Sequence, residues 1–521
     1  MRTPTEWSVV AGAPMGCTMS KSSDAFASSR APSTAPTDPE FSNASVQLVD
    51  RPSDGEFPSS GAENLHAAYP LYSAFGNRYL ARQADIESNA RTYPRSLPIA
   101  LRAGRGVIVE DTEGREYIDC LAGAGALALG HNHPVVVEAI RATLAEQAPF
   151  QTLDLPTPLK DRFIRELFDS LPPTFAEDFK IQFCGPSGAD AVEAALKLVK
   201  TATGRRGVAS FQGAYHGMTH ATLGVTGEPT PRRAVGGLGG EVQFLPYPSD
   251  YRCPFGLGGE AGSDIGARYI ENLLEDPNSG VLPPAGMILE VVQGEGGVNP
   301  APDDWLRKIR DITKRRGIPL ILDEVQTGLG RTGRMYACEH AGVTPDVLVL
   351  SKAIGGGLPL SVVVYHRDLD IWKAGAHAGT FRGNQLAFAS GAATIRHIMR
   401  ERLDLNAETM GARLRRGLAS IAEDASCIAD IRGRGLMVGV EIVDDRAPDG
   451  AMRPAAPETA RKIQHECLRR GLILELGGRF ASVVRLLPPL IVSDSDIGAI
   501  LDRFEAALKA VERGYASSAS R

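Results

Sequence analysis

The sequence predicts an α/β protein with a large, mostly parallel sheet covered by helices on both faces, plus a smaller α+β part. From about residue 180 to residue 369, short apolar runs alternate with amphipathic helical stretches, as in strands joined by crossover helices. After about residue 384 the pattern changes to longer helices and a few later strand-like runs. Polar residues also stand where several apolar runs end, and ligands bind at the carboxyl ends of such strands.

Composition limits the classes of protein that fit. A chain of 521 residues is long enough for two or more domains. The net charge of −6 and the absence of a dense Lys/Arg stripe exclude a general nucleic-acid binder. No apolar run approaches the ~18 residues of a membrane helix. The seven cysteines are scattered without a C-x-x-C pair, which indicates reduced thiols in a cytoplasmic protein.

The chain divides into four stretches by composition and pattern. Residues 1–75 are rich in Ser, Ala and Pro, without a secretory apolar segment, and are expected to be a disordered tail. A transit peptide and an overextended start remain open for this tail. Residues 76–148 are expected to contribute to the small domain, 149–383 to form the large domain, and 384–521 to complete the small domain.

The elements of the large part follow in chain order. Its expected strands are KIQFCG, GVASFQG, EVQFLPYP, AGMILEVVQG, IPLILDEV, DVLVLSKAI and LSVVVYH. Its clearest helices are ADAVEAALKLVKTATG, closed by Gly204, and DDWLRKIRDITKRRG. Farther on, RGRGLMVGVEIV and SVVRLLPPLIV are each expected to form a strand.

Lys352 directly follows the apolar run DVLVLS and precedes three glycines. Burial at the mouth of a strand disfavours the ammonium form and lowers the pKa of a lysine. The neutral amine is a nucleophile that forms a Schiff base with a carbonyl group. The alternative is a lysine whose charged end extends into solvent beyond the strand.

Two further strand ends carry groups of complementary chemistry. Gly185, Ser187 and Gly188 lie between a strand and a helix start, where free N–H groups and the helix dipole favour a phosphate; the alternative is a glycine turn with Ser187 as helix cap. Asp323 ends the run LILD, where a carboxylate needs a cationic or donor partner; the alternative is an aspartate bonded to backbone amides.

Tyr215 and His216 follow another strand and offer a ring face for stacking. His216 and His220 are four residues apart, but the HExxH glutamate is missing, so no metal site is predicted. Residues 328–333, GLGRTG, fit G-x-G-x-x-G without opening a helix, which argues against a dinucleotide site. A phosphate cradle, a carboxylate, an aromatic ring and a Schiff-base lysine together fit pyridoxal phosphate.

An ordered set of motifs carries a family resemblance: GPSGADAVEAALK, GAYHG, EVVQGEGG, LILDEVQTGLGRTG, LSKAIGGGLPL and GTFRGNQLA. Over about residues 90–510 the chain resembles class III aminotransferases of the type I pyridoxal-phosphate fold. The resemblance implies that Lys352 forms the Schiff base, that Asp323 holds the pyridinium nitrogen and that Gln326 lies near the ring hydroxyl.

The same resemblance implies the remaining cofactor contacts and the assembly. Ser187, Gly188 and Ala189 would contact the phosphate, with Tyr215 and His216 against the ring. Thr380 would reach the phosphate of a neighbouring subunit, which implies an obligate dimer or a dimer of dimers.

Two residues are implied in substrate selection. Arg485 matches the family arginine that binds the α-carboxylate of glutamate or 2-oxoglutarate, and a guanidinium fork suits a carboxylate. Glu295 matches the acid that masks this arginine while the other amine donor enters by its carboxylate-free end. The alternative for Arg485 is a surface arginine on a strand.

Within the class, FQTLDLPTPLKDRF, YRCPFGLGGE and HAGTFRGNQLA look most like enzymes that exchange the 4-amino group of L-2,4-diaminobutyrate with 2-oxoglutarate. Such enzymes serve siderophore, peptide-antibiotic or ectoine biosynthesis. Ornithine, 4-aminobutyrate or lysine as donor, an aminomutase reaction, and a catalytically silent regulatory protein remain open as alternatives.

Overall fold

The structure is a computed structural model that describes residues 76–519, except 239 and 447–451. The expected disordered tail, residues 1–75, lies outside the described residues. Among the helices described, none is long and apolar enough to cross a membrane. Six of the seven cysteines fall in the described part of the chain, and all six are free thiols.

A seven-stranded sheet forms the large part of the protein, in the order β4-β12-β11-β10-β7-β5-β6. Its strands are β4 (Phe179–Phe183), β5 (Val208–Phe211), β6 (Val242–Leu245), β7 (Gly286–Glu290), β10 (Leu320–Asp323), β11 (Val347–Leu350) and β12 (Val362–His366). Strands β6, β5, β7, β10 and β11 are parallel to one another, while β12 is antiparallel to β11 and β4. The predicted mostly parallel sheet is therefore confirmed.

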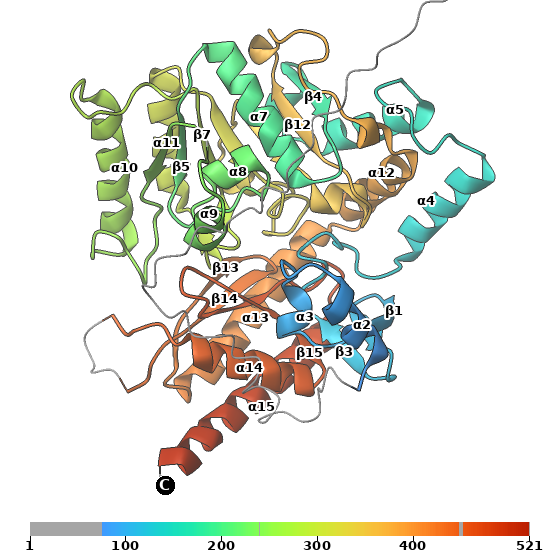
Figure 1. Cartoon of the computed structure of the whole chain (residues 1–521), viewed down its shortest axis with the longest axis vertical. Helices are drawn as coiled ribbons and strands as arrows, with labels where there is room; N and C mark the ends of the chain where they lie inside the picture. Colours follow the sequence, from blue (N-terminus) through green and yellow to red (C-terminus); the bar gives the residue numbers. More distant parts are fainter. Residues whose placement is uncertain (1–75, 239, 447–451, 520–521) are drawn as a thin grey trace, which may run out of the picture. The chain divides into compact units, whose positions relative to one another are not determined.

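Both faces of this sheet are buried. Ile321 belongs to a core shared with α7 (Gly188–Thr203), whereas its neighbours Leu320 and Leu322 belong to a second core that includes Trp305 of α11 (Asp303–Arg315). Successive side chains of a strand point to opposite faces, so the sheet has helices on both sides, as predicted. Figure 1 shows α7 lying over the strands on one face.

Two smaller four-stranded sheets combine distant parts of the chain. One contains β1 (Leu101–Arg105), β2 (Ile108–Asp111), β3 (Glu116–Asp119) and β15 (Leu472–Ile473). The other contains β13 (Ile428–Arg434), β14 (Met437–Ile442), β17 (Val483–Leu486) and β16 (Glu475–Gly477). Because β15 pairs with β3, an early segment and a late segment share one sheet; the domain boundaries at residues 148 and 383 remain a prediction.

One expected strand is wrong in detail. The stretch RGRGLMVGVEIV contains the end of β13, a turn, and β14, which pair as an antiparallel hairpin. Gly435 in this turn has a φ of +52°, and a Cβ there would lie 2.5 Å from the carbonyl oxygen of Arg331. The turn therefore needs a glycine, and the apolar run on either side conceals the reversal.

The remaining elements complete the described part of the chain. Helices α4 (Pro134–Ala145) and α5 (Pro158–Ser170) pack on α12 (Gln385–Arg400). The other α-helices are α2 (Arg78–Ile86), α3 (Tyr93–Ser96), α6 (Pro173–Ala176), α8 (His220–Val225), α9 (Pro229–Ala234), α10 (Gly259–Glu275), α13 (Leu403–Glu423), α14 (Pro457–Arg469) and α15 (Asp494–Ala519). Short elements are β8 (Val292–Gln293), β9 (Asn299–Pro300) and the 3₁₀ turns η2 (Ala337–His340), η3 (Lys352–Gly355), η4 (Arg367–Leu369) and η5 (Thr380–Gly383).

Candidate active site

Lys352 begins the turn η3, two residues beyond the end of β11. Its φ of +51° is in the left-handed region, which costs a residue with a side chain about 1–2 kcal/mol. Burial lowers the pKa of the Lys352 ammonium, against a raising effect of Glu295; Arg485 lowers it and Asp323 raises it. The lysine is thus held in a strained conformation, with three other candidate residues close enough to affect its charge.

The glycines after Lys352 allow the turn to lie against α12. Gly356 has a φ of +60°, and a Cβ there would lie 2.6 Å from Thr394 Oγ1 and 2.7 Å from the carbonyl oxygen of Ser390. Contacts under 3 Å would force the turn away from the helix. Close packing on α12 therefore sets the position of the lysine.

Asp323 ends β10 and forms a buried pair with His216, which follows β5. Asp323 Oδ2 lies 2.8 Å from His216 Nδ1, and Asp323 Oδ1 accepts a hydrogen bond of 3.0 Å from the Val325 N–H. His216 Nε2 is buried and has no partner among the described residues. The carboxylate is therefore held in a fixed direction by one ring and one backbone amide.

Glu290, at the end of β7, connects two of the loops around this pair. It is buried and accepts hydrogen bonds of 2.9 Å from the N–H groups of Tyr215 and Gly294. Burial raises the pKa of Glu290 to about 7, with His216 opposing and Asp323 reinforcing the rise. The half-buried Tyr215 and the loop that leads to Glu295 are both ordered by this one side chain.

The glycine-containing turn of the sequence prediction forms the first turn of α7, and its phosphate contact stays a prediction. Ser187 is the N-cap, and its Oγ accepts a 3.4 Å hydrogen bond from the Asp190 N–H. A Cβ on Gly188 would lie 2.9 Å from Val325 Cγ1, so the glycine lets this turn approach the loop after Asp323. Ala189 packs under Gly217, where a Cβ would lie 2.6 Å from that of Ala189. Ser187 is exposed and Gly188 and Ala189 are partly exposed.

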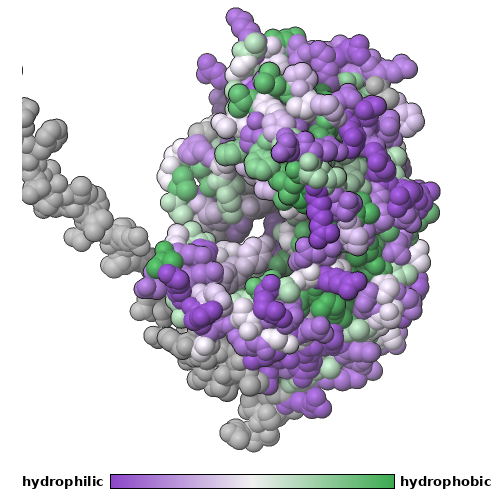
Figure 2. Space-filling model, turned by 90° about the vertical axis from the view of Figure 1, so that its right-hand side faces the viewer, coloured by the Kyte–Doolittle hydropathy of each residue, from purple (hydrophilic) through white to green (hydrophobic). Residues whose placement is uncertain are grey.

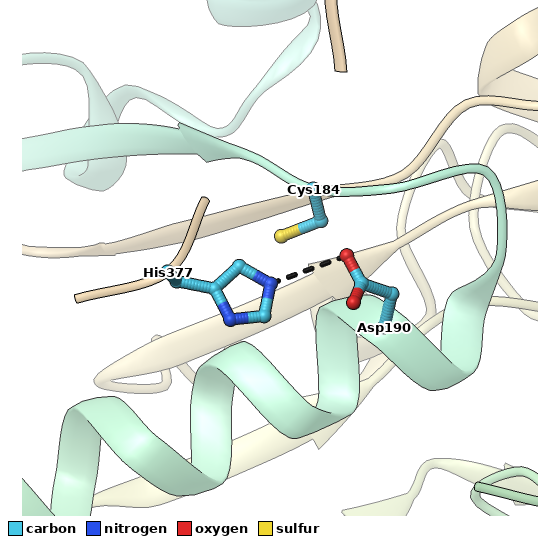
Figure 3. Close-up of side chains that lie close together, drawn as sticks. All are labelled: Cys184, Asp190 and His377. Atoms are coloured by element: carbon cyan, nitrogen blue, oxygen red, sulfur yellow. Dashed lines mark hydrogen bonds and ion pairs between the residues drawn. The ribbon is translucent and has the colours of Figure 1, made fainter. Parts of the chain in front are cut away.

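Cys184, Asp190 and His377 lie together beside this turn (Figure 3). Asp190 accepts hydrogen bonds from the Gly185 N–H and, at 3.2 Å, from His377 Nε2. Burial raises the pKa of the Cys184 thiol well above its usual value, and the thiol donates to the Gln182 carbonyl at 3.7 Å. Asp190 and His377 thus satisfy each other, the thiol bonds a backbone carbonyl, and Asp190 holds the loop that enters α7 through Gly185.

Arg485, in the middle of β17, is fully buried and is held by side chains from three other segments. Its Nη1 lies 2.6 Å from Glu295 Oε2 and 3.4 Å from Glu475 Oε2, and its Nη2 donates to Gln326 Oε1 at 3.3 Å. Burial acts to lower the pKa of Arg485, but Glu295 and Glu475 raise it overall. The alternative of a surface arginine is wrong, because the side chain has no exposed area.

The structure brings most of the predicted residues to one edge of the sheet. Thr380 stands apart on the exposed turn η5, and its predicted role concerns a second subunit. Sequence analysis missed Glu475 and Tyr93: the Tyr93 hydroxyl donates to Glu475 Oε1 at 2.9 Å. These residues are 382 positions apart, and no local pattern marks either one.

A cavity of about 720 Å³ opens next to Tyr215 and Glu295. Small-molecule sites have volumes of roughly 300–1,000 Å³. Figure 2 shows a face of the molecule that is hollowed near its middle, with hydrophobic side chains among the hydrophilic ones around the opening. The site can therefore admit a small substrate.

Known proteins resemble this chain along most of its length. Residues 89–508 match the family model described as aminotransferase class-III. A diaminobutyrate–2-oxoglutarate aminotransferase of Rhizobium meliloti is 54% identical, covering 87% of this chain and 96% of the relative. One of Haemophilus influenzae is 48% identical, covering 83% and 95%.

Solved structures agree with the sequence relatives. An amine transaminase from an uncultivated Pseudomonas species, in its PLP-bound form, superposes with a TM-score of 0.73 at 28% identity and covers 82% of this chain and 98% of that one. The type I fold expected from the motifs is thus confirmed, with its lysine turn and buried Asp323 at the carboxyl edge of the sheet. The chain belongs to the class III aminotransferase family.

Proposed function

We propose that this protein is a pyridoxal-phosphate-dependent diaminobutyrate–2-oxoglutarate transaminase. It moves the 4-amino group of L-2,4-diaminobutyrate to 2-oxoglutarate, giving L-aspartate 4-semialdehyde and L-glutamate. Lys352 and Asp323 lie at the carboxyl edge of the large sheet, and Arg485 of the small sheet is near enough to act on the charge of Lys352; this combination carries the reaction type. The choice of donor rests on relatives of that name, up to 54% identical over nearly their whole length.

The residues of the site fit pyridoxal phosphate. The N–H groups at the start of α7 suit a phosphate, and the fixed Asp323 carboxylate suits a protonated ring nitrogen. Lys352 Nζ has a lowered pKa and suits the aldehyde carbon. Ser187, Gly188 and Ala189 would hold the phosphate, and Tyr215, His216 and Gln326 would flank the ring.

Lys352 is the proton carrier of the proposed mechanism. When bound, pyridoxal phosphate supplies an electron sink conjugated to the amine-bearing carbon of the substrate. The Lys352 amine would take the proton from that carbon and return one to complete the transfer. Its lowered pKa favours the neutral form that accepts a proton. His216 keeps the Asp323 carboxylate oriented throughout.

Arg485 and Glu295 allow one site to accept two different substrates. With Glu295 at 2.6 Å, the guanidinium is occupied and does not attract a carboxylate, which suits the carboxylate-free end of the diamino acid. When 2-oxoglutarate enters, its α-carboxylate replaces Glu295 on the guanidinium fork. Although burial raises the pKa of Glu295, Arg485 lowers it overall, so the masking acid remains ionised.

The proposal includes a homodimer in which Thr380 of one copy reaches the phosphate held by the other. The exposed side chain of Phe381, beside Thr380, is 58% accessible, as expected for a segment that a second copy covers. Light scattering should show that the protein is a dimer. The Thr380→Val variant should remain a dimer but bind the cofactor more weakly. A monomeric, fully active protein would contradict this part of the proposal.

A donor panel tests the function. Purified protein is assayed with 2-oxoglutarate and either L-2,4-diaminobutyrate, ornithine, 4-aminobutyrate or lysine, with L-glutamate formation as the readout. The expected result is a kcat/KM for diaminobutyrate far above that for the other three donors. Lys352→Ala is the matched control and should form no glutamate with any donor. A higher kcat/KM for another donor would overturn the substrate assignment.

A further inference from the structure

The carboxylate of Glu475 has no role in the reaction described so far, yet it lies directly at the substrate-binding arginine. Glu475 opens β16 and is paired with Arg485 across β16 and β17. Its side chain is 14% exposed. Oε1 accepts the Tyr93 hydroxyl at 2.9 Å. Oε2 is buried and accepts no hydrogen bond from any described residue.

The charges around Arg485 do not balance. One guanidinium faces two carboxylates, Glu295 at 2.6 Å and Glu475 at 3.4 Å. The shorter contact belongs to Glu295, so the charge of Glu475 is only partly offset. A buried carboxylate oxygen without a donor is costly, and burial raises the pKa of Glu475 for this reason, with Arg485 and Lys352 lowering it. The site therefore lacks one cationic hydrogen-bond donor.

We propose that Glu475, positioned by Tyr93, binds the 2-ammonium group of the diamino acid and so selects it as amine donor. An ammonium has three N–H donors and one positive charge, which are the two things missing at Oε2. The 4-amino group of the same molecule then points to Lys352, whose charge already acts on Glu475. This inference rests on the proposed function and names the residue that sets its donor specificity.

Two donors that differ by this one group make the test direct. L-2,4-diaminobutyrate and 4-aminobutyrate have the same carbon chain, carboxylate and 4-amino group, and only the first has a 2-ammonium. Glu475→Gln removes the charge and keeps the size of the side chain. We expect kcat/KM for diaminobutyrate to fall about 10- to 100-fold, mainly through KM, as for loss of a charged hydrogen bond. The value for 4-aminobutyrate should stay the same or rise.

Matched variants separate recognition from structural damage. Glu466→Gln removes another carboxylate of similar exposure, 11%, which pairs with Arg469 at 3.0 Å on α14; it should leave the ratio of the two donors unchanged. Glu475→Asp keeps the charge and should recover part of the ratio. Tyr93→Phe removes the supporting hydroxyl of a ring that is 44% exposed, and should shift the ratio in the same direction by a smaller factor.

Each result decides the inference. Equal losses for both donors in Glu475→Gln, or an unchanged ratio, overturn it. If Glu475→Gln does not fold, Tyr93→Phe decides, because an unchanged donor ratio in that variant overturns it as well. A wild-type protein that rejects diaminobutyrate refutes the proposed function together with the inference. A wild-type protein that accepts it, with a ratio insensitive to Glu475, refutes the inference alone.

Discussion

Asp323→Asn changes a single buried charge and tests two consequences at once. The carboxylate makes two hydrogen bonds, with His216 at 2.8 Å and with the Val325 N–H at 3.0 Å. Bonds to charged groups contribute about 1.5–3 kcal/mol each and neutral ones about 0.5–1.5. Replacing two of the first kind by two of the second should lower the free energy of unfolding by about 2 kcal/mol.

The effect on turnover should be larger than the effect on folding. Without the carboxylate, a protonated ring nitrogen has no acidic partner, and the charge that develops on the substrate carbon is less well stabilised. We expect kcat to fall at least about 100-fold, which corresponds to about 2.7 kcal/mol in the barrier. Stability is measured by urea denaturation, and kcat in the native protein with diaminobutyrate and 2-oxoglutarate.

The adjacent residue provides the control. Glu324 is buried like Asp323, but it accepts hydrogen bonds from the Ala337 and Cys338 N–H groups, away from the site. Glu324→Gln should therefore lower stability by a similar amount while the folded enzyme keeps its kcat. A native Asp323→Asn protein with wild-type kcat would refute the reasoning, as would an equal loss of kcat in both variants.

Three further outcomes are expected. Cofactor uptake by the apoprotein should speed up as pH rises through the lowered pKa of Lys352, since only the neutral amine reacts. Glu295→Gln removes a charge that raises this pKa, so the midpoint of the pH profile should move to lower pH. An unshifted midpoint would contradict the assignment. Arg485→Lys should raise KM for 2-oxoglutarate about 10- to 100-fold, because an ammonium lacks the fork; an unchanged KM speaks against carboxylate binding there. Gly411→Ala should destabilise the fold by about 3 kcal/mol in denaturant melts, because its Cβ would lie 1.9 Å from the Gly435 carbonyl oxygen; a neutral effect would show that α13 can move.

The local sequence predicted the candidate site residues that stand directly after buried strands. The apolar runs before Asp323 and Lys352 indicated buried strands, and a parallel sheet brings its carboxyl ends to one edge. Both ends of α7 were also visible, because Ser187 stands directly before the helical pattern as its N-cap and Gly204 ends it as its C-cap. Hydrophobic periodicity and helix capping depend only on residues a few positions apart, so both can be recognised from the sequence.

Contacts between distant segments were not visible in the sequence. The pairing of His216 with Asp323 depends on two strands whose ends meet 107 positions apart, and sequence analysis placed His216 only against the ring. The hairpin at Gly435 was hidden inside one continuous apolar run.

The sequence by itself determined the parallel α/β sheet, the lysine after its strand and the glycine-containing turn at the start of α7, because periodicity and helix capping are local properties of a chain. The family resemblance placed Glu295 at Arg485, but only the tertiary structure showed that Glu475, bonded to Tyr93, lies there as well. Burial and charge depend on what folds against a residue, whatever its neighbours in the chain.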